Sequence, residues 1–309
     1  MAVEGSGSGA RAKEFSSLVR SVAGARVRGN AQVQVTGLSY DSRRVEPGWV
    51  FFCVRGTRTD GHRFTSQAIE RGAKALVVET GREKGLAPPP QGAMAIVADT
   101  RAAMAPMART FYDDPSSQLV LAGVTGTNGK TTTALMLEAI FRAAGYSSGV
   151  IGTVEYRIGA RRMKAEHTTP EAVDLQALLA QLVAEGASHA AMEVSSHALS
   201  LHRADGCQFS AAVFTNLTPE HLDFHADMRE YLETKKRLFE DPQYLPKRGP
   251  RVNAVNLDDP SGGEIARAAQ GTTLTYALDS AADCRAEKIV LRAEGTSFVA
   301  VLPSGRSLV

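Results

Sequence analysis

The stretch GVTGTNGKTTT, residues 123–133, has the residue types and spacing of a loop that binds phosphate. Gly126 and Gly129 allow backbone N–H groups to converge on an anion at the start of a helix, where the helix dipole adds partial positive charge. Lys130 would contact nucleotide phosphates and the Thr131 hydroxyl would bind Mg²⁺. The usual pattern needs glycine at position 124, where this chain has Val124, so we predict a phosphate loop with an uncommon sequence. The alternative is a glycine-rich turn with an unrelated lysine.

A carboxylate follows a second apolar run, in HAAMEVSSHALSLHR, residues 189–203. Ligands of doubly wound sheets bind at the carboxyl ends of the strands, and Glu193 stands at such an end. We therefore predict that Glu193 completes a Mg²⁺ site opposite Thr131, with a purely structural strand-end residue as the alternative. His197 and His202 are more typical of packing or surface residues than of ligands.

A third polar cluster lies in FTNLTPEHLDFHADMREYLETKKRLF, residues 214–239. His221, Asp223 and His225 are close together after another apolar run, which indicates either a metal or substrate site or a solvated loop. Lys235 and Lys236, on the helix that follows, are typical of an exposed basic face.

A fourth cluster, Asp41, Ser42 and Arg43, lies in YDSRRVEPGWVFFCVRGTRTDGHRF, residues 40–64. It fits a turn and an anion-binding site equally well, and composition does not decide between them.

The elements that must position these residues alternate between short apolar strands and helices with a period near 3.6. Strands are predicted at residues 33–42, 49–54, 75–79, 94–99, 119–124, 147–154, 189–194, 211–217 and 251–257. Helices are predicted at residues 63–72, 101–113, 131–145, 173–186 and 228–241. This alternation predicts an α/β fold with a doubly wound, mainly parallel sheet, and the segments after about residue 270 add further strands at the C-terminal end.

Turn residues at 113–118, DDPSSQ, predict a boundary between two domains. Residues 1–14 are predicted to form a flexible tail, residues 15–115 a small N-terminal α/β domain, and residues 118–309 the doubly wound domain.

Composition narrows the class of protein. Of 309 residues, 43% are hydrophobic and 22% charged, which is ordinary for a soluble protein of two domains. The net charge of +2 gives little support to nucleic-acid binding. Cys53, Cys207 and Cys284 form no C-x-x-C pair, so we expect a reducing cytoplasm rather than disulfides or zinc. No apolar run has the length of a membrane span and the N-terminus has no apolar signal-peptide core.

Five stretches together resemble the Mur ligases: GVTGTNGKTTT, HTTP (167–170), MEVSSHAL (192–199), TNLTPEHLDFH (215–225) and YLETKKRLF (231–239). With DSRRVEPGWVFFCVRGTRTDGHRF in the first domain, the chain is most similar to the MurE type, which adds the third residue to UDP-N-acetylmuramoyl-L-Ala-D-Glu. The resemblance covers nearly the whole chain after the first dozen residues. It implies an N-terminal domain that binds the UDP substrate and a central P-loop ATPase-like domain.

The resemblance also implies a reaction and a set of site residues. ATP would phosphorylate the D-Glu carboxylate to an acyl phosphate, which the amine of an amino acid attacks. Lys130, Lys235 and His221 would be catalytic, and Lys235 would be carbamylated. Mg²⁺, at two sites, would be bound by Thr131, Glu193, His221 and the Lys235 carbamate. The ATP-binding residues would be Gly126, Thr127, Asn128, Gly129, Lys130, Thr131, Thr132 and Asn216.

For the UDP substrate, the resemblance implies that Ser42 contacts the uridine part. Thr168, Thr169, Ser195 and Arg203 match contacts to the muramoyl-dipeptide part. The partners are then this substrate, ATP, and diaminopimelate or L-lysine, with diaminopimelate favoured because it is the commoner substrate of the family. No nucleic acid, membrane or second copy of the chain is implied, so we expect a cytoplasmic monomer.

Mur ligases have a third, C-terminal domain, and this sequence stops at VLPSGRSLV, where the hinge to that domain is expected. We therefore expect the 309 residues to be a truncated ligase that binds substrate but turns over weakly or not at all alone. A module that binds the nucleotide or the UDP precursor without catalysis is the main alternative. Folylpolyglutamate synthetase shares the phosphate loop but lacks the N-terminal UDP-substrate domain.

Overall fold

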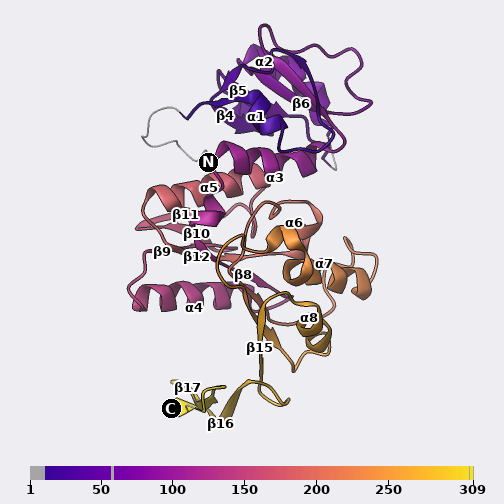
Figure 1. The fold of residues 1–309 in the computed structure, drawn as a ribbon. Coiled ribbons are helices and arrows are strands. Elements are labelled where there is room, and N and C mark those ends of the chain that lie inside the picture. Colours follow the sequence, from indigo (N-terminus) through magenta and orange to yellow (C-terminus); the bar gives the residue numbers. More distant parts are fainter. Residues whose placement is uncertain (1–10, 57–58, 306, 309) are drawn as a thin grey trace. The chain divides into compact units, whose positions relative to one another are not determined.

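The computed structural model describes residues 11–309 except 57, 58, 306 and 309 (Figure 1). Residues 1–10 of the predicted tail lie outside the described residues, whereas Lys13–Glu14 form strand β1, which pairs with β3 (Gln34–Val35). The described chain divides into two compact units. Unit 1 comprises residues up to Pro115 together with Glu171–Ala180 and Leu201–Gly206, and unit 2 comprises the rest.

Unit 1 is built on a five-stranded sheet of order β2-β7-β6-β5-β4. Neighbouring strands are parallel except for β2, which is antiparallel to β7. The strands are β2 (Arg26–Gly29), β4 (Gly37–Ser39), β5 (Trp49–Phe52), β6 (Ala75–Glu79) and β7 (Ala93–Val97). The helices are α1 (Phe15–Val19), α2 (Thr65–Glu70) and α3 (Thr100–Phe111), with short 3₁₀ helices at Ser42–Arg44 and Gly61–Phe64.

Alternation along these strands explains why the sheet is covered on both faces. Val50 and Phe52 pack in a core with α1 and α3, whereas Phe51 between them packs in a second core with Ala68 of α2. Successive side chains of a strand point to opposite faces, so a continuous apolar run is what a sheet covered on both sides requires.

Unit 2 is built on an eleven-stranded sheet of order β11-β10-β9-β12-β8-β13-β14-β15-β16-β17-β18. The strands from β9 to β16 in this order are parallel, and β10, β11, β17 and β18 are antiparallel additions at the edges. The parallel strands are β8 (Val120–Thr125), β9 (Ser148–Ile151), β12 (His189–Glu193), β13 (Ala211–Phe214), β14 (Val252–Asn256), β15 (Thr272–Ala277) and β16 (Cys284–Arg292). The others are β10 (Glu155–Ile158), β11 (Arg161–Lys164), β17 (Gly295–Val301) and β18 (Ser307–Leu308).

The remaining helices connect these strands. They are α4 (Lys130–Ala143), α5 (Ala172–Ala184), α6 (Ser196–Ser200), α7 (Met228–Glu240) and α8 (Gly262–Ala268). The chain leaves β8 through α4 to β9 on one side, and later reaches β13 on the other side of β8. The strand order therefore reverses at β8, and the carboxyl end of this strand is the place where open α/β sheets bind ligands.

The predicted α/β class, with a mainly parallel sheet and extra strands at the C-terminal end, is confirmed. None of the helices in the described part of the chain is both long and apolar enough to cross a membrane.

Candidate functional site

The loop between β8 and α4 has the backbone that a phosphate loop needs. Gly126 and Gly129 have φ values of 146° and 83°, which L-residues with a side chain rarely adopt. A Cβ on Gly126 would overlap with Oγ1 of Thr215. The loop is held by the segment after β13: Thr127 N donates to the Asn216 carbonyl (2.8 Å), and Asn128 N donates to the Asn216 side chain (2.9 Å). Asn216, predicted to lie near the nucleotide, thus holds the loop in place through these two hydrogen bonds.

Two lysines meet at this loop. Lys130, the first residue of α4, donates through Nζ to the carbonyls of Gly126 (2.9 Å) and Thr127 (2.7 Å). Lys235 of α7 donates through Nζ to the same Gly126 carbonyl (3.0 Å). Burial lowers the pKa of Lys130, although Glu193 and Glu220 oppose the shift. Thr132 lies exposed on the first turn of α4.

Lys235 is buried, with 1% of its surface exposed, and its ammonium group lies 4.4 Å from the centre of the Tyr231 ring. Burial, reinforced by the charge of Lys130, lowers the pKa of Lys235 to about 7, against the weaker effect of Glu220. Lys236 is different: it forms ion pairs with Glu233 (2.6 Å) and Glu264 (3.2 Å). An exposed basic face therefore describes neither lysine, because Lys235 is buried and Lys236, with 12% of its side chain exposed, is paired with two carboxylates.

Glu193, the last residue of β12, places a buried carboxylate beside the loop. It accepts hydrogen bonds from the Thr131 hydroxyl (3.0 Å to each oxygen) and from the backbone N (2.7 Å) and hydroxyl (3.1 Å) of Thr153. A Cβ on Gly152 would overlap with Oε1 of Glu193, so glycine makes room for the carboxylate. Carboxylate and hydroxyl oxygens are the ligands that Mg²⁺ prefers, and thus Thr131 and Glu193 fit a magnesium ion.

Three of the predicted substrate residues gather around Glu193. The Thr168 hydroxyl lies 3.0 Å from the Thr153 hydroxyl, within hydrogen-bonding distance. Thr169 is buried and donates to the Glu193 carbonyl (2.8 Å), while its oxygen accepts from Ser195 N (3.3 Å). Thr153 and Gly152 were not predicted as site residues, although a Gly-Thr pair directly after a buried strand is a usable signal for a site at a strand end.

The predicted histidine cluster forms in part. The ring of His221 lies 4.7 Å from that of His197 and 6.2 Å from that of Tyr231, between ring centres. His225 is buried against Tyr231, and neither of its ring nitrogens has a hydrogen-bond partner among the described residues. Burial lowers the pKa of His225. Asp223 is exposed.

Within the part of the chain that the structure describes, no three His, Cys, Asp or Glu side chains are arranged to hold a metal ion.

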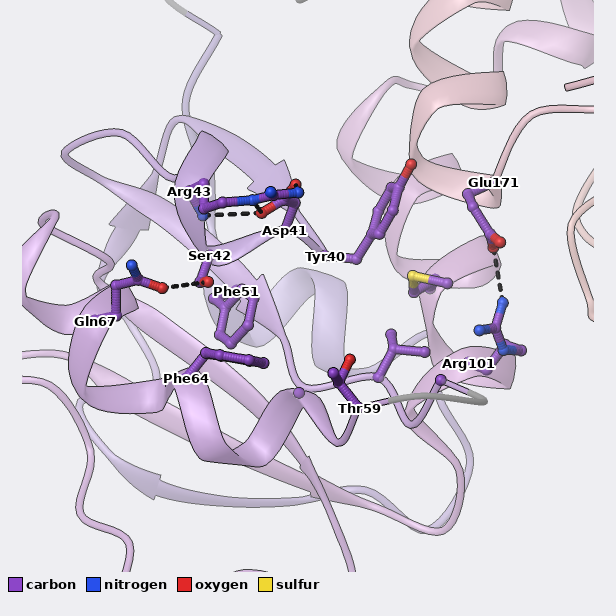
Figure 2. A pocket seen from close by; sticks show the side chains of 14 residues that line it. Tyr40, Asp41, Ser42, Arg43, Phe51, Thr59, Phe64, Gln67, Arg101 and Glu171 are labelled. Atoms are coloured by element: carbon purple, nitrogen blue, oxygen red, sulfur yellow. Dashed lines mark hydrogen bonds and ion pairs between the residues drawn. The ribbon is translucent and has the colours of Figure 1, made fainter. Parts of the chain in front are cut away.

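Ser42 and Arg203 belong to unit 1. Ser42 lines a pocket of about 560 Å³, a size typical of small-molecule sites, and donates to Oε1 of Gln67 at 2.6 Å (Figure 2). Arg203 forms an ion pair with Glu171 (2.9 Å), whose other oxygen is paired with Arg101 (2.9 Å). Arg101 and Glu171 line the same pocket as Ser42.

Comparison with known proteins decides the family. Residues 124–308 match the Mur ligase middle domain, and residues 34–112 match the description "Mur ligase family, catalytic domain". The chain belongs to the Mur ligase family. The resemblance noted in the sequence is thereby confirmed.

Among its relatives are enzymes named UDP-N-acetylmuramoyl-L-alanyl-D-glutamate–2,6-diaminopimelate ligase. The one from Geobacter sulfurreducens is 44% identical over 292 residues, which is 93% of this chain and 56% of the relative. The one from Solibacter usitatus is 45% identical over 269 residues, 87% of this chain and 53% of the relative. This chain thus spans about half the length of the relatives that it matches.

Solved structures agree. A diaminopimelate ligase of the same name superimposes with a TM-score of 0.75 at 30% identity, over 89% of this chain and 55% of that one. MurF from Acinetobacter baumannii, at 21% identity and a TM-score of 0.67 over 96% of this chain and 60% of that one, shares the fold.

Proposed function

We propose that this chain provides the substrate-binding and phosphoryl-transfer parts of an ATP-dependent ligase that adds diaminopimelate to UDP-N-acetylmuramoyl-L-Ala-D-Glu. The contact between Thr131 and the buried Glu193, beside a loop that carries Lys130, is the observation on which the proposal rests. It supplies a cation for phosphate and oxygen ligands for Mg²⁺ at one place. The names of the relatives supply the choice of amino acid.

The chemistry follows from the weakness of a carboxylate as an electrophile. Transfer of the γ-phosphoryl of ATP to the D-Glu carboxylate gives an acyl phosphate and ADP, and attack by the amine then expels phosphate and forms the amide. The residues of the loop position anions and offset negative charge on the transferred group. Lys130 would leave the carbonyls of Gly126 and Thr127 for the phosphates. Mg²⁺, held by Thr131 and Glu193, would neutralise phosphate charge.

We propose that Lys235 is carbamylated and that its carbamate, with His221, binds a second metal. CO₂ reacts only with an unprotonated amine, and a pKa of about 7 leaves about half of the Lys235 side chains neutral at pH 7. The same burial that makes an ammonium costly thus keeps the amine in the unprotonated form that reacts with CO₂. The carbamate would add an anionic oxygen ligand to the imidazole of His221.

For the UDP substrate, we propose that the pocket of Ser42 takes the uridine end. Thr168, Thr169, Ser195 and Arg203 would contact the muramoyl-dipeptide end, with Arg203 held in position by Glu171. We also propose that the chain acts in the cytoplasm, as a monomer.

Positional isotope exchange in ATP tests the proposal. ATP labelled with ¹⁸O in its β,γ-bridge is incubated with the chain, Mg²⁺ and UDP-N-acetylmuramoyl-L-Ala-D-Glu, without amino acid. Reversible formation of the acyl phosphate scrambles the label, and Lys130→Ala and Glu193→Gln should abolish the exchange. Binding of both substrates by calorimetry without any exchange would favour the alternative, a module that binds without catalysis. If the chain bound neither ATP nor the UDP substrate, the proposed ligase and the binding module would both be refuted.

A further inference from the structure

The pocket of unit 1 contains a polar pair whose hydrogen-bonding direction is set. Ser42 is buried, and its Oγ lies 2.6 Å from Oε1 of Gln67. An amide oxygen can only accept, so the Ser42 hydroxyl donates its one proton to Gln67. Toward any other group, Ser42 then presents lone pairs only, and acts as an acceptor.

Local structure holds the two partners in place. Ser42 is the first residue of the 3₁₀ helix Ser42–Arg44. Asp41 caps this helix, because its carboxylate accepts a hydrogen bond from Arg43 N (3.0 Å). Gln67 lies on α2, which packs against that 3₁₀ helix. The adjacent charges satisfy one another, because the Arg43 guanidinium binds back to Asp41 (3.0 and 2.7 Å). Figure 2 shows this ion pair and the Ser42–Gln67 pair as separate interactions.

Gln67 supplies the opposite polarity. Its side-chain nitrogen carries two N–H donors, and the residue is exposed. The oxygen of this amide faces Ser42, so the Ser42 hydroxyl remains the group that discriminates between ligands. The complementary ligand atom is a donor, as the imide N–H of uracil is. Cytosine has an acceptor nitrogen at the same ring position, which Ser42 held as an acceptor would reject.

An aromatic side chain of the same pocket suits a planar ring. Phe64 lines the pocket and keeps 38% of its surface exposed, whereas Phe51, which also lines it, is buried in the core. In Figure 2 both rings lie near the Ser42–Gln67 pair. Stacking of a base on an aromatic ring contributes about 1–3 kcal/mol without distinguishing one base from another, so the choice of base falls to the polar pair.

We propose that Gln67 is a positioning residue that fixes Ser42 as an acceptor, and that the two together select uracil over cytosine. This inference rests on the proposed function, which assigns the pocket to the uridine end of the substrate. To that assignment, the inference adds the residues that set base specificity and the direction of the hydrogen bond that Ser42 makes.

Titration of UDP and CDP into the chain, by calorimetry or ligand-detected NMR, tests the inference. The wild type should prefer UDP by roughly tenfold or more, since a site that hydrogen-bonds one partner rejects another of reversed polarity. Gln67→Met, which frees the Ser42 proton, should reduce the preference to less than about threefold. Ser42→Ala, which removes the acceptor, should do the same. Gln32→Met, at an exposed position of unit 1, should keep the wild-type ratio.

The outcomes separate the inference from the function that it extends. Equal loss of UDP and CDP affinity in Gln67→Met would mean that Gln67 only supports the fold of the pocket, and would overturn the inference. So would a wild type that binds UDP and CDP equally well, although the proposed function would then stand. A wild type that binds neither nucleotide would refute the proposed function and the inference with it.

Discussion

Replacement of Gly126 by alanine should damage the phosphate loop more than any other glycine substitution in its vicinity. The φ of 146° costs an L-residue about 1–3 kcal/mol. The new Cβ would also overlap with Thr215 Oγ1 and lie 3.0 Å from both N and O of Asn216. Relief of that overlap must move Thr215, whose hydroxyl donates to the Asn128 carbonyl at 2.6 Å, at a further cost of about 1–3 kcal/mol. We expect a total of about 3 kcal/mol or more.

The loop offers its own matched controls. At Gly129, with a φ of 83°, the nearest atom to a new Cβ is 3.8 Å away, so Gly129→Ala should cost the backbone strain alone, about 1 kcal/mol. Gly145→Ala, with a φ of 85° and open space around it, should cost the same outside the loop. Urea unfolding and the affinity for MgATP, measured on all three variants, provide the comparison.

A double-mutant cycle with Thr215→Ala identifies the cause. Loss of the Thr215 hydroxyl removes the overlapping atom, so Gly126→Ala/Thr215→Ala should be more stable than the sum of the single effects by about 1 kcal/mol or more. Strict additivity, or a Gly126→Ala variant no less stable than Gly145→Ala, would refute the steric argument.

Three further predictions concern unit 2. In CO₂-free buffer, the free energy of unfolding should rise with pH between about 7 and 10.5, because in this range Lys235 is mostly protonated in the unfolded chain but not in the folded one. Lys235→Met should remove this pH dependence and raise the free energy of unfolding at pH 7 by roughly 3–4 kcal/mol. Thr153→Val, which removes one hydroxyl donor to Glu193, should weaken Mg²⁺-dependent ATP binding by about tenfold in calorimetry, with little change in binding of Mg²⁺-free ATP. Arg251→Lys should lower the free energy of unfolding by about 2–4 kcal/mol in urea titrations, because the guanidinium donates to three backbone carbonyls and to Asn253, which an ammonium cannot reproduce.

The parts of the fold that the sequence predicts are those with a strong apolar period. The strand predicted at 119–124 overlaps β8, and the helix predicted at 131–145 overlaps α4. The hairpin β10–β11 was not predicted, because β11 has the sequence RRMK and lies at the edge of the sheet, where it buries little apolar surface. Helix α8 was not predicted either, because it begins with two glycines, which have poor helix propensity.

The candidate site was predictable where topology alone sets it. Glu193 is the last residue of a strand next to β8. The rule that ligands of open α/β sheets bind at the carboxyl ends of the strands was therefore sufficient to predict that it lies near Thr131. Lys235 was not identified as buried from residue type, since lysine is rarely buried. Helical period does carry the signal: Lys235 follows Tyr231 by four residues and precedes Leu238 and Phe239 by three and four, and all three are fully buried. Lys236, one position further, is partly buried and forms ion pairs with Glu233 and Glu264.

The contacts of the Gly126 carbonyl bear on the proposed carbamylation of Lys235. It accepts from Lys130 and Lys235 at once, so two ammonium groups approach a single acceptor and each disfavours the charge of the other. Conversion of Lys235 to a carbamate would replace this repulsion by attraction between an anion and Lys130. A phosphate bound at Lys130 would then face a carbamate rather than a second ammonium group. Two anions side by side are stable only with cations between them, so the proposed modification and the proposed requirement for a second metal depend on each other.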